Sequence, residues 1–108
     1  MAFLRTQKKE GKKVVGYGAA AKGNTLLNFC GIKSDLIHFV VDAAPSKQGK
    51  YLPGSHIPVV AEAQIRMIQP DYVIIFPWNL KKEIMTQLKY IQHWGGKLVI
   101  TIPKLKVL

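Results

Sequence analysis

A glycine-rich segment at residues 16–24, GYGAAAKGN, has the residue types and spacing of an anion-binding loop. Gly16, Gly18 and Ala21 fit the G-x-G-x-x-A pattern of dinucleotide-binding turns, in which the first glycine allows a tight turn and the second lets the backbone approach a phosphate. The amides that begin the following helix would face the anion, and Lys22 would add a positive charge. The segment therefore predicts a phosphate or nucleotide site. Small residues are also required wherever a helix packs tightly on a parallel sheet, so a purely structural interpretation stays open.

Two further positions fall where the same ligand would lie. Asp42 follows Gly18 by 24 residues, close to the spacing of about 20 at which a carboxylate accepts hydrogen bonds from a ribose hydroxyl. It could equally begin the turn that precedes Pro45. Trp78 could stack on a base or sugar, or pack against a neighbouring side chain. Asn79 is a good N-cap for the helix that follows.

The hydropathy pattern supplies the elements that would position these residues. Apolar, β-branched runs alternate with amphipathic stretches whose apolar residues recur every three or four positions. This alternation predicts an α/β fold with a doubly wound parallel sheet, helices on both faces and strand order 3-2-1-4-5. Ligands of such sheets bind beyond the carboxyl ends of the strands, where the winding reverses. We expect strands at residues 13–17, 36–41, 57–60, 72–76 and 98–102, and helices at residues 1–10, 19–30, 61–69 and from 79 to the glycines at 95–96.

The length, charge and cysteine content of the sequence indicate which classes of protein are compatible with it. The 108 residues form one domain, and a net charge of +10 favours anionic partners such as nucleotides or phosphates. Cys30 is the only cysteine, so an intrachain disulfide or a four-cysteine metal site cannot form, and a reducing cytoplasm is expected. His38, His56 and His93 are too widely spaced for a short metal-binding motif, and we expect neither a metal site nor a membrane span.

Four ordered blocks carry a resemblance to a known family: VVGYGAAAKGNTLL, VDAAPSKQGKYLPGSHIP, DYVIIFPWNL and GGKLVITIPKLKV. Together they resemble the Rossmann-like C-terminal domain of C-methyltransferases that act on nucleotide-linked deoxysugars. Enzymes of this kind also have an N-terminal zinc-binding module and a central domain that binds S-adenosylmethionine. The resemblance implies that this chain helps to hold a nucleotide-diphosphate sugar against the central domain, in cis or in trans. It also implies that the catalytic residues and the methyl-donor site lie outside this chain.

The same resemblance gives the expected substrate-binding residues. They lie on the glycine-rich loop, on the loop after the second strand and on the loop after the fourth strand: Gly16, Tyr17, Gly18, Ala19, Ala20, Lys22, Asn24, Asp42, Lys47, Gln48, Trp78 and Asn79. Residues 1–11 resemble the middle of a helix that continues upstream from an absent domain, as in an excised domain or a truncated gene product. Exposed apolar surface at residues 1–4 or around Trp78 would mark the interface with the absent domain.

Two other functions remain open from the sequence. A stand-alone NAD-type dinucleotide-binding module would explain the glycine spacing and Asp42, although such a site normally spans two βαβ halves and this chain barely completes the second. A nucleic-acid-binding or regulatory protein would explain the positive charge, but the lysines are dispersed and no nucleic-acid-binding motif is recognised.

Overall fold

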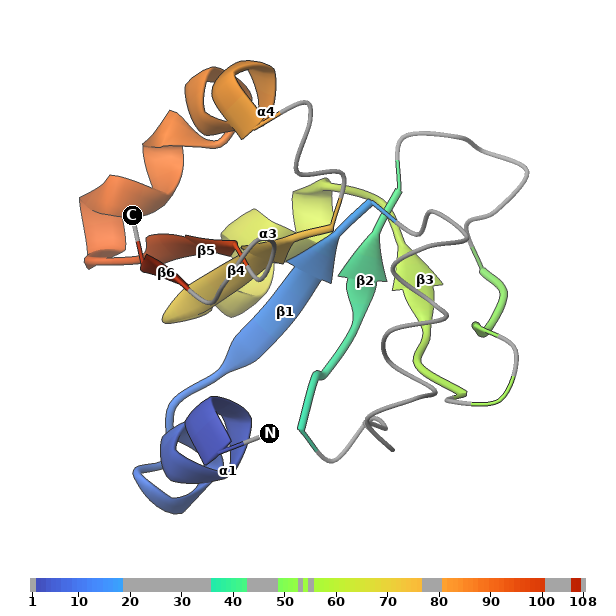
Figure 1. Cartoon of the computed structure of the whole chain (residues 1–108). Helices are drawn as coiled ribbons and strands as arrows, with labels where there is room; N and C mark the ends of the chain where they lie inside the picture. Colours follow the sequence, from blue (N-terminus) through green and yellow to red (C-terminus); the bar gives the residue numbers. More distant parts are fainter. Residues whose placement is uncertain are drawn as a thin grey trace.

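The computed structural model describes residues 2–18, 36–42, 49–52, 54, 56–76, 81–100 and 106–107. The described residues form short strands and helices (Figure 1). The elements are α1 (Ala2–Lys9), β1 (Val14–Tyr17), β2 (Val40–Val41), β3 (Val59–Val60), α3 (Ala63–Ile68), β4 (Tyr72–Ile75), α4 (Lys81–Gln87), the 3-10 helix η2 (Lys89–Trp94), β5 (Lys97–Ile100) and β6 (Lys106–Val107).

The strands form one sheet in the order β3-β2-β1-β4-β5-β6. The first five are parallel, which confirms the predicted α/β class and the strand order 3-2-1-4-5. The sixth strand was not predicted, because the chain after Pro103 reads as a basic tail. Val107 instead pairs antiparallel with Val99, so β6 covers the outer edge of β5 and becomes the edge strand on that side.

Side chains of successive strand residues enter different cores, because a strand alternates its faces. On β1, Val14 packs with Leu4 of α1 in one core, and Val15 packs with Ile65 of α3 in the other. Figure 1 shows α1 at the amino end of β1 and α3 behind the sheet. Leu4 is 1% exposed, so it belongs to the core and the suggestion that it marks an exposed interface is wrong.

The largest departure from the expected elements is the last helical segment. One continuous helix was expected up to the glycines at 95–96, but α4 ends at Gln87 and a 3-10 helix begins at Lys89. Leu88 and Ile91 are both buried, and their spacing of three residues fits a 3-10 turn as well as an α-helix. Gly95, with φ of 79°, ends the segment as expected. The helix predicted at residues 19–30 lies outside the described residues.

Candidate functional site

The winding of the sheet reverses between β1 and β4. β1 pairs with β2 on one side and with β4 on the other, so connections leave β1 and β4 in opposite directions. Gly18, Asp42 and Phe76 come directly after β1, β2 and β4 and therefore lie at the same carboxyl edge. This is the edge at which a ligand of a doubly wound sheet is expected.

Gly16 lies within β1 and does not form the turn. It pairs with Val40 and Ile74, and its amide donates a hydrogen bond to the Phe39 carbonyl at 2.9 Å. A Cβ atom added at Gly16 would lie 2.5 Å from Cε2 of Phe76 and 3.2 Å from Cγ2 of Val40. Gly16 is therefore required by the packing of the Phe76 ring across the strand, which differs from the tight-turn role expected from the motif.

Gly18 is the residue at which the chain turns out of the sheet. Its φ is 86°, a left-handed conformation that strongly favours glycine. Its amide donates to the Val41 carbonyl at 2.7 Å. Since the amides of both motif glycines are used within the sheet, an anion would need amides from residues after Gly18.

Asp42 and Tyr17 both lie at the carboxyl edge of the sheet, but only the Tyr17 side chain packs in a core. Asp42 is partly exposed and follows β2, with its amide bonded to the Val60 carbonyl at 3.1 Å. The Tyr17 side chain packs in the core that contains Ile65 and Ile84. Strand alternation thus turns the Tyr17 ring towards α3 and α4, away from the face that Gly16 shares with Phe76.

Tyr17 belongs to a polar cluster that the sequence interpretation missed. Gln87 Nε2 donates a hydrogen bond to Tyr17 Oη at 2.6 Å and also contacts Glu62 Oε1. Tyr90 Oη donates to Glu62 Oε2 at 3.2 Å, and the Arg66 guanidinium lies 4.0 Å from the centre of the Tyr90 ring. We call these five residues the tyrosine–glutamate cluster. It links β1 to α3, α4 and η2.

Burial controls the ionisation of the two tyrosines. Burial raises the pKa of Tyr17, opposed by its hydrogen bond with Gln87 and assisted by the charges of Glu62 and Asp42. Burial, with the negative charge of Glu62, raises the pKa of Tyr90 to about 12. Both hydroxyls therefore stay protonated at neutral pH, so the cluster can hold elements and donate hydrogen bonds but supplies no phenolate nucleophile.

A sequence signal for Glu62 did exist. It follows the last residue of β3 by two positions, as Asp42 follows β2 by one, so parallel pairing brings both to one edge. Glu62 was nevertheless not among the residues expected at this site. Gln87 carries no such signal, because an exposed glutamine on a helix has no distinctive spacing.

Of the expected site residues, the structure describes Gly16, Tyr17, Gly18 and Asp42, and these four share the carboxyl edge. The other expected positions lie outside the described residues: Ala19, Ala20, Lys22, Asn24, Lys47, Gln48, Trp78 and Asn79. Within the described ranges, no three His, Cys, Asp or Glu residues are grouped to hold a metal ion. The helices described there are also too short or too polar to cross a membrane.

Comparison with known proteins identifies a family and a relative that this chain resembles. A family profile described as "C-methyltransferase C-terminal domain" matches residues 1–103. The sequence is 40% identical, over 99 residues covering 92% of this chain, to a C-methyltransferase named NovU from Streptomyces niveus. The match spans 24% of the length of that relative.

Proposed function

Because the chain belongs to the family of C-methyltransferase C-terminal domains, we propose that it binds the methyl acceptor, a nucleotide-diphosphate sugar, and is not catalytic by itself. The methyl donor in this proposal is S-adenosylmethionine, held by another domain in cis or in trans. The similarity to NovU spans 24% of that enzyme, so the remaining length can contain the domain that performs the chemistry. Chemistry on nucleotide sugars and the single cysteine favour a cytoplasmic location.

The observation that carries this proposal is the carboxyl edge between β1 and β4. Gly18 turns the chain out of the sheet with a positive φ beside Asp42, at the point where the winding reverses. A carboxylate at this place suits the hydroxyl groups of a ribose or sugar. The net charge of +10 favours a ligand with a diphosphate.

Different residues of the site would contact different parts of the ligand. Amides of Ala19 and Ala20, with Lys22 and Asn24, would hold the diphosphate, while Gly16 and Gly18 shape the strand end that leads to them. Asp42, Lys47 and Gln48 would contact the sugar hydroxyls and phosphate from the second-strand loop. Trp78 and Asn79 would close the opposite side, and the tyrosine–glutamate cluster would fix Tyr17 and α4 beneath them.

Calorimetric titration of the 108-residue chain with a thymidine-diphosphate sugar tests this function. We expect saturable 1:1 binding that weakens roughly tenfold or more in Lys22→Gln, because a charge-assisted hydrogen bond is lost. Lys97→Gln removes the same charge from the first residue of β5, at the opposite edge of the sheet, and serves as the matched control. Equal affinity in the two variants, or binding by neither the variants nor the parent chain, would contradict the proposal.

The alternative is a stand-alone NAD-type module. The glycine spacing and Asp42 at the end of β2 favour it. The antiparallel β6 counts against it, since a dinucleotide site continues with a parallel second half. Fluorescence titration with NADH separates the two functions: micromolar binding would favour the dinucleotide module, and its absence alongside sugar-nucleotide binding would favour the acceptor domain.

A further inference from the structure

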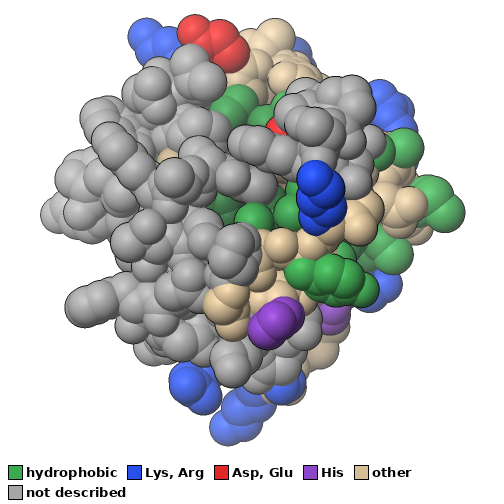
Figure 2. All heavy atoms as spheres, turned by 90° about the vertical axis from the view of Figure 1, so that its right-hand side faces the viewer, with side chains coloured by type: hydrophobic (Ala, Val, Ile, Leu, Met, Phe, Trp, Pro, Cys, Tyr) green, Lys and Arg blue, Asp and Glu red, His purple; other side chains and the backbone are tan. Residues whose placement is uncertain are grey.

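The amino end of the sheet, opposite the proposed substrate edge, carries a second concentration of positive charge. A hollow of about 260 Å³ lies there, lined by Lys8, Gly11, Lys12, Lys13, Leu36 and His38. We call it the amino-end basic pocket. Figure 2 shows several Lys and Arg side chains at the bottom of the view, the end of the molecule at which Figure 1 places α1.

Backbone hydrogen bonds hold the frame of this pocket. The Gly11 amide donates to the Lys8 carbonyl at 3.0 Å and closes the last turn of α1, with φ of 74° at Gly11. The Lys13 amide donates to Asp71 Oδ2 at 2.8 Å, and the His38 amide donates to the Val14 carbonyl at 3.0 Å. The basic side chains therefore project from fixed backbone positions at the end of α1 and beside the first residue of β1.

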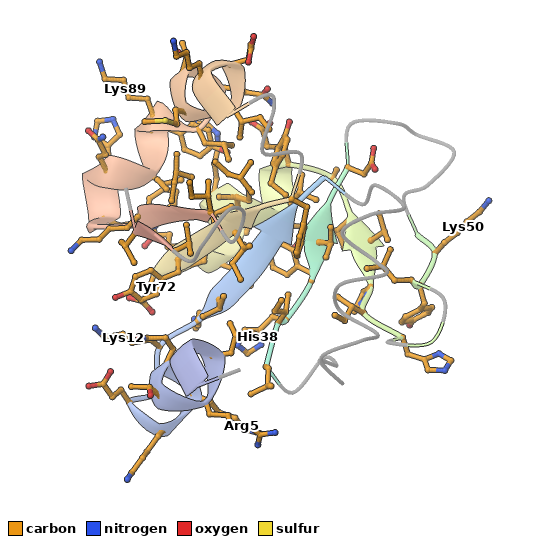
Figure 3. All side chains as sticks on the ribbon, in the orientation of Figure 1. Arg5, Lys12, His38, Lys50, Tyr72 and Lys89 are labelled. Atoms are coloured by element: carbon orange, nitrogen blue, oxygen red, sulfur yellow. The ribbon has the colours of Figure 1, made fainter. Side chains whose placement is uncertain are left out.

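Local structure accounts for only part of this charge. Lys8 and Lys9 lie in the last turn of α1, where cations interact favourably with the helix dipole. Lys12 and Lys13 lie beyond the helix, and the Lys12 amide donates to the Gln7 carbonyl at 2.9 Å. Lys12 Nζ lies 5.7 Å from the centre of the Tyr72 ring, and Figure 3 shows the side chain reaching towards that ring. The aromatic contact positions the Lys12 ammonium without neutralising it.

The charges around the amino-end basic pocket indicate the kind of ligand that it would bind. Three lysines and a histidine are among the residues that line the hollow. Glu10 is a near neighbour in the chain, and the Asp71 carboxylate accepts the Lys13 amide, so the surplus is positive. The volume is several times the roughly 30 Å³ occupied by one water molecule but below the range of drug-sized ligand sites. We propose that the amino-end basic pocket binds a small polyvalent phosphate anion of the diphosphate class, either as free inorganic diphosphate or as part of a nucleoside diphosphate.

This site is separate from the proposed substrate edge. Val14 begins β1 at the basic pocket and Tyr17 ends it at the carboxyl edge, and the strand separates these two residues by roughly 10 Å. The ligand would enter from the side of α1 and the segment before β2. Its binding would therefore perturb backbone amides that a ligand at Gly18 and Asp42 does not touch.

Titration of the ¹⁵N-labelled chain with inorganic diphosphate at constant ionic strength tests the proposal. We expect saturable amide shifts at Gly11–Lys13 and at Leu36–His38, with binding at least tenfold weaker in the double variant Lys12→Gln/Lys13→Gln. The matched control Lys50→Gln/Lys82→Gln removes the same two charges elsewhere and should bind as the parent chain does. A parallel titration with a nucleoside diphosphate identifies the source: tighter binding would indicate contacts with the nucleoside, and equal binding would indicate the free anion.

The proposal is overturned if these amides do not move, or if the two double variants lose affinity equally, since the effect would then be one of net charge. Circular dichroism checks that each variant is folded. If the pocket double variant is not folded, the single variant Lys12→Gln with Lys82→Gln as its control gives the same comparison. Shifts confined to Gly18 and Asp42 would refute this second site while leaving the proposed substrate edge intact.

Discussion

Substitution of Gly16 by alanine distinguishes a packing role for this glycine from a ligand-binding role. The added Cβ would lie 2.5 Å from Phe76 Cε2 and 3.2 Å from Val40 Cγ2, and Phe76 is buried in the core. Overpacking of this kind costs about 1–3 kcal/mol, while replacing a strand glycine by alanine recovers about 0.5–1 kcal/mol. We therefore expect Gly16→Ala to lower the free energy of unfolding by about 1–2 kcal/mol.

Phe76→Leu supplies the partner variant, because the shorter side chain withdraws the ring atoms that would clash. In that background, Gly16→Ala should be neutral or slightly stabilising. Gly18→Ala serves as the control: its cost of about 1–2 kcal/mol comes from the left-handed backbone and so should persist in both backgrounds. Urea unfolding of the single and double variants measures these changes in the free energy of unfolding.

An equal cost of Gly16→Ala in the parent chain and in the Phe76→Leu background would refute a packing role for Gly16. Such additivity would mean that the ring does not set the requirement for glycine at this position. In the expected case, the coupling free energy between the two substitutions is about 1 kcal/mol or more, and the melting temperature of Gly16→Ala falls by roughly 4–8 °C per kcal/mol lost.

Three further predictions concern other contacts. Gln87→Leu should lower the free energy of unfolding in urea by about 1 kcal/mol, because it leaves the partly buried Tyr17 hydroxyl without that donor. The exposed Gln92→Leu is the control, and equal effects of the two substitutions would argue against the cluster. Since the pKa of Tyr90 is raised to about 12, its contribution to stability should be complete below pH 10 and lost as the pH rises from about 10 to about 12. Between about pH 8 and about pH 11, the free energy of unfolding should therefore fall less in Tyr90→Phe than in the parent chain. Identical falls in the two proteins would count against this assignment. Gln7 is buried and its Oε1 has no hydrogen-bond partner among the described residues, so Gln7→Met should stabilise the chain by about 1 kcal/mol, and a loss of stability in the same assay would show that the amide is needed.

The sheet could be predicted from the sequence because its central strands are continuous apolar runs. β1 and β4 are buried on both faces, and their β-branched residues leave little choice of structure. β2 and β3 are shorter than expected, with only Val40–Val41 and Val59–Val60 in the ladder. Leu36, Ile37 and Ile57 are buried without belonging to a strand. Their hydropathy therefore predicted burial correctly but did not predict strand pairing.

The candidate site was less predictable, because its contacts join distant segments. The spacing of Gly16 and Gly18 was visible, but only the position of the Phe76 ring shows that Gly16 serves packing and Gly18 the turn. Likewise, the direction of Tyr17 follows from strand alternation once the cores are known. Its partner Gln87, 70 residues further along the chain, has no local signal. The α4–η2 break was hidden because the spacing of three residues between Leu88 and Ile91 fits either helix type.

We propose the carboxyl edge between β1 and β4 as the binding site for a nucleotide-diphosphate sugar. Titration of the ¹⁵N-labelled chain with a thymidine-diphosphate sugar tests it most directly, read at the amides of Gly18, Asp42 and Phe76. We predict saturable shifts that group at these three residues and lose affinity in Lys22→Gln. An unchanged spectrum at this edge under saturating ligand, or shifts only at the amino-end basic pocket, would contradict the claim.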